Sequence, residues 1–280
     1  MSPPGDADLL IVVRSALLDA LDALADQLDA LVLIGAQAIY LHTGAAPVAL
    51  AEATKDSDLA VDPRLLNDSP LLDDAMKNAG FHRNLTSPQP GAWLSPDGVP
   101  VDLMVPEALA GVRGRRGARI PPHSDHATRR TTGLEAAVVD HSSMTIGALV
   151  PEDPRTFEIK VAGPAALVVA KLHKLGERQD RPERLVDKDA HDVYRLLVAT
   201  DTEHLGRTLG DLRDDWLAGE ATTLAIAYLR GLFASGPEAL GSMMAGRAEQ
   251  LVGDPAVVSA AVAALAQDLM SAVGVRDEFR

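Results

Sequence analysis

The sequence predicts an α+β (α/β-like) protein, with a mixed sheet and flanking helices followed by a C-terminal helical bundle. Short apolar runs that read as strands alternate with helical segments through the first part of the chain. From Gly163-Pro164 onward only helical patterns follow. A length of 280 residues also favours two domains over one. We therefore expect an α/β domain over residues 1–162 and a helical domain over residues 163–280.

The first expected element is an amphipathic helix from about Ala7 to Leu28, because apolar residues recur along one stripe of it. Five interrupting charges and the absence of a basic leader argue against a signal peptide or a membrane span. The next expected elements are a strand at 31–34, a helix opening near Gln37, a strand through Asp58, a helix over 71–78, and strands near Ala92 and Asp102.

The second half of the chain is predicted in the same way. Apolar and β-branched runs predict strands at 136–139, 143–146 and 156–161. Helical periodicity then predicts helices that begin at Pro164 and continue over 187–200, 202–218, 222–233 and 255–273.

Two aspartates at the start of the Asp58 strand are the first candidate site residues. Successive side chains of a strand point to opposite faces, so Asp56 and Asp58 share one face. Mg²⁺ prefers oxygen ligands and keeps positions open for phosphate oxygens. The pair is therefore a candidate anchor for a metal-bound nucleoside triphosphate (NTP).

The neighbouring segments add a phosphate site and a third acid. Gly35 permits a tight turn, and the helix that follows offers free backbone N–H groups to a phosphate. Asp102 faces away from its apolar strand neighbours, and a buried carboxylate requires a partner. Three acids on adjacent strands can hold two metal ions, or two can hold metal while the third accepts a proton from an attacking hydroxyl.

These residues resemble the signature of the nucleotidyltransferase superfamily: Gly35-Ala36, Asp56-Ser57-Asp58 and Asp102. The segments 171–178 and 188–197 resemble the helical motifs of its AbiEii/AbiGii toxin branch, which includes the MenT toxins of bacterial toxin–antitoxin pairs. The resemblance covers roughly residues 31–200. It implies a nucleotidyltransferase-type sheet and a Mg²⁺-dependent transfer, with two ions possible, from an NTP to the 3′ end of tRNA, with a cognate antitoxin protein as partner.

The resemblance also implies a role for each matching residue. Asp56, Asp58 and Asp102 are expected to bind metal and to take part in catalysis. Lys171 and Asp192 are also expected to be catalytic, with Asp192 orienting a lysine or taking part directly. Nucleotide binding falls to Gly35, Ala36, Gln37, Lys174 and Arg178, with the helical domain presenting its basic residues to the cleft. Ala36 stands where Ser or Gly is usual, so Gln37 or backbone amides would replace a missing hydroxyl.

The alternative interpretation of the helical motifs is that they form two ordinary solvent-exposed helix faces without a catalytic role. Lys171, Lys174 and Arg178 fall on one helical stripe, which ordinary i, i+4 ion pairs also explain. His173 and His191 do not make a convincing ligand set for a phosphohydrolase of the HD type. The sequence contains no P-loop, nucleophile elbow or dinucleotide fingerprint.

Charge and cysteine content limit the partners. With a formal net charge of −14, the chain is not a general nucleic-acid binder, so RNA contact must be local. The candidates lie in a basic, Gly-containing loop, in which Arg113, Arg115, Arg116 and Arg119 are followed by His123, His126, Arg129 and Arg130. A solvated connection without a specific role explains this loop equally well. The absence of cysteine gives no support to an extracytoplasmic protein, so we expect a cytoplasmic one. No membrane partner is expected, because charges interrupt the N-terminal apolar segment.

Two other functions stay open at this level. The same core could serve a small-molecule acceptor, as in antibiotic-modifying enzymes. Because of Ala36, a catalytically silent protein with a nucleotide-binding fold that acts by binding a partner is the other alternative.

Overall fold

The computed structural model describes residues 6–44, 54–86, 89–112 and 116–274. The chain divides into two compact units. The first comprises residues 1–38 and 53–162, and the second comprises residues 39–52 and 163–280. Residues 39–52 thus belong with the helical unit, whereas the sequence-based division leaves them in the first domain.

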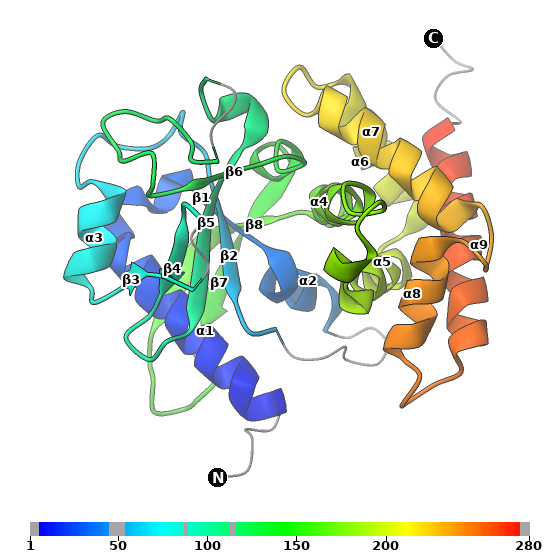
Figure 1. Ribbon diagram of the computed structural model, residues 1–280, viewed down its shortest axis with the longest axis horizontal. Coiled ribbons are helices and arrows are strands. Elements are labelled where there is room, and N and C mark those ends of the chain that lie inside the picture. The colour runs from blue at the N-terminus through cyan, green and yellow to red at the C-terminus, as the bar shows by residue number, and fades with distance from the viewer. Residues whose placement is uncertain (1–5, 45–53, 87–88, 113–115, 275–280) are drawn as a thin grey trace. The chain divides into compact units, whose positions relative to one another are not determined.

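The first unit is built on an eight-stranded mixed sheet, which confirms the predicted fold class (Figure 1). The strand order is β3-β4-β5-β2-β1-β8-β7, and β6 pairs with β5. Parallel pairs are β1–β8, β2–β5 and β5–β6, and the others are antiparallel. The strands are β1 (Leu31–Ile34), β2 (Ser57–Val61), β3 (His82–Arg83), β4 (Ala92–Leu94), β5 (Pro100–Pro106), β6 (Arg129–Thr131), β7 (His141–Gly147) and β8 (Thr156–Ala162).

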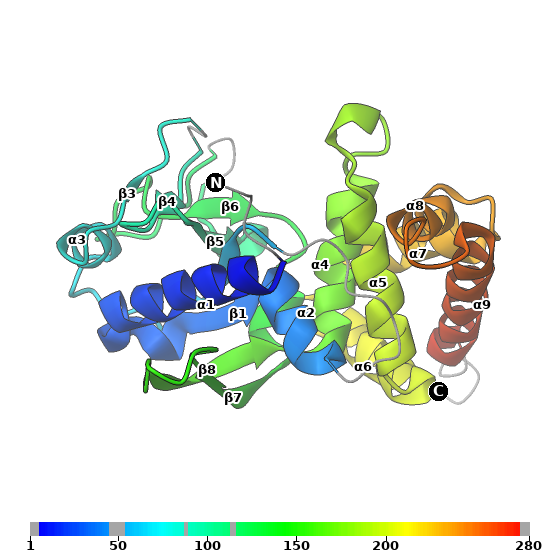
Figure 2. The ribbon, with the colours of Figure 1, turned by 90° about the horizontal axis from the view of Figure 1, so that it is seen from below.

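Helix α1 (Asp6–Ala23) packs along one face of this sheet against β2, β5 and β8 (Figure 2). It ends before the predicted Leu28, and a 3₁₀ turn, η1 (Ala25–Ala30), follows it. The turn directs the side chain of Gln27 to a loop, where its Nε2 donates to the carbonyls of Asn67 and Pro70 at 3.1 and 2.9 Å. These contacts favour a break in the helix although the apolar stripe continues.

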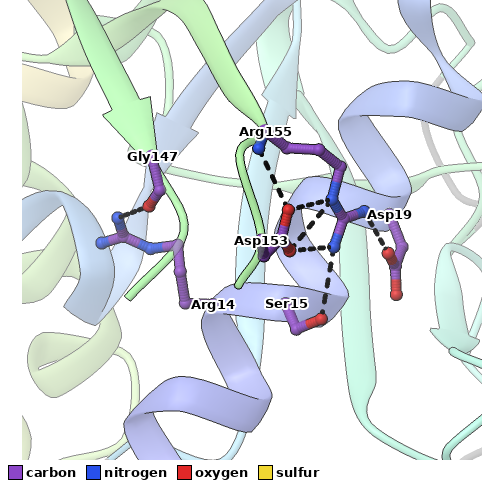
Figure 3. Close-up of polar contacts among 6 residues, drawn as sticks. All are labelled: Arg14, Ser15, Asp19, Gly147, Asp153 and Arg155. Atoms are coloured by element: carbon purple, nitrogen blue, oxygen red, sulfur yellow. Dashed lines mark hydrogen bonds and ion pairs between the residues drawn. The ribbon is translucent and has the colours of Figure 1, made fainter. Parts of the chain in front are cut away.

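Two arginines link α1 to the β7–β8 hairpin (Figure 3). Arg155 binds Asp153 with two nitrogens and also pairs with Asp19 of α1. Arg14 of α1 donates to the carbonyl of Gly147 at 3.1 Å. The hairpin at this end of the sheet is therefore fixed to α1 by charge-assisted hydrogen bonds.

The remaining elements of this unit are short. They are α3 (Leu72–Asn78), η2 (Glu107–Leu109) and η3 (Ala136–Val138). The strand predicted at 136–139 is wrong, because Ala136–Val138 form one buried 3₁₀ turn. A short apolar run has no periodicity that separates a strand from a buried turn.

The second unit is helical. Its elements are α4 (Pro164–Gly176), η4 (Pro182–Arg184), α5 (Asp187–Ala199), α6 (Thr202–Asp214), α7 (Gly219–Leu229), the π-helical turn η5 (Arg230–Ala234), α8 (Leu240–Ala248) and α9 (Pro255–Gly274). Helix α2 (Gly35–Thr43) starts in the first unit and ends in the second. There Arg195 of α5, itself fully buried, donates to the carbonyl of Thr43 at 3.0 Å. A cation at the C-terminus of a helix stabilises its end.

Among the described residues one helix, α9, is long and apolar enough to cross a membrane by length and composition alone. It packs against α6 and α8. Its buried side chains include Val258, Val262, Leu269 and Val273. This packing is typical of a core helix, and such a single match is weak evidence for a membrane span.

Candidate functional site

Strand register brings two of the three predicted acids together. Asp58 of β2 lies directly opposite Asp102 of β5, and adjacent strands are about 4.8 Å apart. Ser57 donates to the carbonyl of Val13 in α1 at 3.2 Å, so it faces the helix. Alternation then places Asp58 and Asp102 on the opposite face of the sheet, where both are half-buried. We name this side the acidic face.

Gly35 closes one side of the Asp58 carboxylate. It is the first residue of α2, with φ +70°, and it follows Ile34, the β1 partner of Asp58. A Cβ atom on Gly35 would lie 2.2 Å from Oδ2 of Asp58. The turn therefore requires glycine twice, for its backbone conformation and for the close approach of the carboxylate.

Replacing Gly35 by Ala is expected to destabilise the first unit by more than the ~1 kcal/mol typical of alanine at positive φ. Gly98→Ala is the matched control, because Gly98 has φ +78° and a Cβ atom added there would have no neighbour within 4 Å. Urea unfolding of both variants measures the difference. Equal losses would contradict a steric conflict between residue 35 and Asp58.

Asp56 does not join the other two acids. It lies just before β2, is exposed, and accepts a hydrogen bond from the Thr54 hydroxyl at 2.7 Å. Within the described ranges no three acidic or histidine side chains lie close enough together to hold a metal ion. The predicted three-acid set is thus not preassembled. Asp58 and Asp102 remain, and Mg²⁺ bound with a nucleotide uses only one or two protein carboxylates beside phosphate oxygens and water.

A cation also lies on the acidic face. Strand β6 places Arg129 opposite Met104 of β5, two residues beyond Asp102 on the same face. Nη2 of Arg129 lies 2.9 Å from Oδ2 of Asp102, with side-chain exposures of 23% and 19%. Sequence alone does not indicate this role, because a strand of three polar residues cannot be told from the basic loop before it.

The side chain of Gln37 points away from the acidic face. Its Nε2 donates to Ser57 Oγ at 2.6 Å, and its Oε1 accepts from Nε of Arg14 at 2.6 Å. Gln37 is 1% exposed, and burial lowers the pKa of Arg14. Since these bonds occupy the amide, Gln37 holds α1, α2 and β2 together, contrary to the expected contact with phosphate. Ala36 is also buried and carries no hydroxyl, so the polar groups that the Gly35 turn could present to an anion are backbone amides.

The second unit holds a cluster of two lysines and two aspartates. Nζ of Lys171 lies 2.7 Å from carboxylate oxygens of both Asp189 and Asp192, and all three residues are buried. Nζ of Lys174 lies 2.8 Å from the same Asp189 oxygen, with its side chain 43% exposed. Lys171 and Asp192 therefore form an ion pair within this cluster. Asp189 is the member of the cluster that the sequence did not predict.

Ion pairing outweighs burial in this cluster. Burial alone would lower the pKa of Lys171, but the charges of Asp189 and Asp192 raise it well above its ordinary value. Burial would raise the pKa of Asp189, but Lys171 and Lys174 hold it well below its ordinary value. Lys171 and Asp189 thus keep their charges near neutral pH.

The other predicted residues are placed less specifically. Arg178 is half-buried and donates to the carbonyl of Arg184 at 3.2 Å. Of the arginines in the basic loop, Arg116 and Arg119 are exposed, whereas Arg113 and Arg115 lie outside the described residues. Arg130 pairs with Glu107 and donates to the carbonyls of residues 110–112. It therefore stabilises the loop itself.

The two histidines that were considered as ligands of a phosphohydrolase site form hydrogen bonds to other residues of the protein. His173 contacts the carbonyl of Ala221 at 2.8 Å, and His191 contacts a carboxylate oxygen of Glu249 at 2.7 Å. Both histidines are buried. These contacts are typical of structural histidines.

Comparisons with known proteins leave the family open. No family model matches the chain, and no curated protein matches it at a significant level. One solved structure, a "putative nucleotidyltransferase from H. pylori", is similar over 95% of this chain and 96% of that chain, with 12% identity and a TM-score of 0.34. A similarity this distant does not carry an assignment of family or function.

Proposed function

We propose that the chain is a Mg²⁺-dependent nucleotidyltransferase that moves a nucleoside monophosphate from an NTP to an RNA 3′-hydroxyl. The supporting observation is that Asp58 and Asp102 lie in register on one sheet face with Gly35 against Asp58. Paired carboxylates beside a glycine turn and a helix start provide both metal ligands and phosphate donors. The motif resemblance adds tRNA as the acceptor and a toxin role with a protein antitoxin, in the cytoplasm.

The chemistry demands little covalent participation from the protein. When bound, Mg²⁺ would supply charge stabilisation to the phosphate oxygens. Asp58 and Asp102 would hold the ion, while Gly35 and the first amides of α2 would bind phosphate. The acceptor hydroxyl would then attack the α-phosphorus, its proton would pass to Asp102 or to a water molecule, and pyrophosphate would leave. Positioning and electrostatic stabilisation supply most of the acceleration in such a displacement.

Basic side chains are the candidates for the remaining contacts. The resemblance assigns phosphate neutralisation to Lys171 and Lys174. Lys171 is buried and held charged by two carboxylates, and Lys174 is half-exposed. Exposed Arg116 and Arg119 are candidates for local RNA contact in an otherwise acidic chain.

Two observations keep the alternatives in view. The net charge of −14 disfavours broad RNA binding, which suits a small-molecule acceptor. The absence of a preassembled three-acid set among the described residues, together with Ala36, suits a protein that binds a nucleotide without turnover.

The experiment supplies each NTP, labelled at the α- or γ-phosphate, to the purified protein with Mg²⁺ and total bacterial tRNA. Label entering tRNA from the α position alone is the expected result. Label from the γ position would mean phosphoryl transfer and would contradict the proposal. Label in low-molecular-weight products would favour a small-molecule acceptor, and Mg²⁺-dependent NTP binding without any transfer would favour the silent protein.

A further inference from the structure

We propose that Arg129 is a positioning residue that neutralises Asp102 and competes with a divalent cation for its carboxylate. This inference deepens the proposed function and rests on it. In that role Arg129 keeps the acidic face weakly attractive to a free metal ion, so that productive metal binding depends on nucleotide phosphate oxygens.

The geometry behind this inference is set by the sheet. Three strands that are neighbours in the sheet, β2, β5 and β6, carry Asp58, Asp102 and Arg129. All three side chains lie on the same face of the sheet. Arg129 is therefore carried by the same hydrogen-bonded framework as the two acids, whereas a loop arginine would not be fixed in this way. The acidic face thus carries two carboxylates in register and, two residues further along β5, one guanidinium.

Other contacts fix the guanidinium where it can reach Asp102. Nη1 of Arg129 donates to Oε1 of Gln89 at 3.0 Å, and Nη2 lies 3.1 Å from Sδ of Met104. The backbone of β6 is paired with β5 on one side and bridged to Gly117 on the other. A planar guanidinium held at several points presents a fixed fork to a carboxylate.

The burial of the Arg129–Asp102 pair indicates how it would change the affinity for a metal ion. Both side chains are mostly buried, so water screens their attraction less than it would on an open surface. A metal ion that binds both oxygens of Asp102 must displace the guanidinium of Arg129. The positive charge of Arg129 also repels the ion. Removing the positive charge should therefore strengthen metal binding, which is opposite to the effect of removing an ordinary stabilising contact.

The test is calorimetric titration of Mg²⁺, without nucleotide, into the full-length wild type and matched variants. Arg129→Gln is expected to bind Mg²⁺ about fivefold more tightly or better, the effect of roughly 1 kcal/mol. Lys77→Gln is the control, because it removes one positive charge from an exposed position of α3 in the same unit and should change affinity less than twofold. Arg129→Lys keeps the charge, so a gain as large as that of Arg129→Gln would overturn the charge-based account.

The outcomes separate this inference from the proposed function. One outcome is that Asp58→Asn weakens Mg²⁺ binding, while Arg129→Gln binds Mg²⁺ with wild-type or lower affinity. That result contradicts only the role of Arg129. If wild-type Mg²⁺ binding, with or without NTP, does not depend on Asp58, both fail.

A measurement on the wild type covers the case in which Arg129→Gln does not fold. In protein labelled with ¹⁵N-arginine, the Nε–Hε signal of Arg129, assigned with Arg129→Lys, is expected to shift as Mg²⁺ is added. A signal that stays unchanged at saturating Mg²⁺ would overturn the inference.

Discussion

Replacing Asp58 by Asn is expected to reduce nucleotide transfer by at least about a thousandfold while leaving the fold intact. The change keeps the shape of the side chain beside Gly35 and removes the charge that would bind metal on the acidic face. Transfer of α-label measures the loss, and thermal unfolding checks the fold.

Asp74→Asn is the matched control for this variant. Asp74 is an exposed residue of α3 in the same unit, so its replacement removes one negative charge away from the acidic face. Its activity should stay within about twofold of wild type, as expected for a screened surface charge. Full activity in Asp58→Asn would remove Asp58 from the mechanism and the proposed function with it.

Replacing Lys171 by Met is expected to cost the second unit about 3–5 kcal/mol of unfolding free energy. Methionine fills a similar volume, but it leaves the buried carboxylates of Asp189 and Asp192 without their shared cation. Urea unfolding followed by circular dichroism, with hydrogen exchange of α4 and α5 to localise the effect, measures this loss.

Lys174→Met provides the comparison within the same cluster. Lys174 contacts only one of the two aspartates in the cluster, and its side chain is 43% exposed, so its removal should cost less than about 1 kcal/mol. Similar small losses in both variants would show that the buried carboxylates do not depend on Lys171.

The parts of the fold that were predicted from sequence have strong local signals. The strands at Leu31–Ile34 and Thr156–Ala162 and the helices from Pro164 to Ala199 follow clear apolar periodicity or turn residues. Alternation alone placed Asp58 and Asp102 away from their apolar neighbours, and the register adds that they lie opposite each other.

The missed elements have weak local signals. Strands β3 and β6 are two and three residues long and polar, so pairing with neighbouring strands determines them. Helix α8 contains Gly241 and Gly246, which lower helix propensity. Both are needed for packing, since a Cβ atom would lie 2.6 Å from Phe233 and 2.4 Å from Pro255, respectively. Such contacts between distant residues are not visible in a local pattern.

The predicted site shows the same limit. Asp56 and Asp58 fit one strand face by spacing, but β2 begins at Ser57, and the carboxylate of Asp56 binds Thr54 instead. Gln37 was expected to contact phosphate, but its partners Arg14 and Ser57 are 23 and 20 residues away in sequence. Arg129 and Asp189 were missed because their roles depend on which carboxylate or lysine the fold places beside them.

The most direct test of the central claim is to quantify pyrophosphate release and nucleotide incorporation together in one reaction of wild-type protein, Mg²⁺, NTP and RNA acceptor. Nucleotidyl transfer at Asp58 and Asp102 predicts equal amounts of the two products, both lost in Asp58→Asn. Incorporation without pyrophosphate, or equal product formation by wild type and Asp58→Asn, would contradict it.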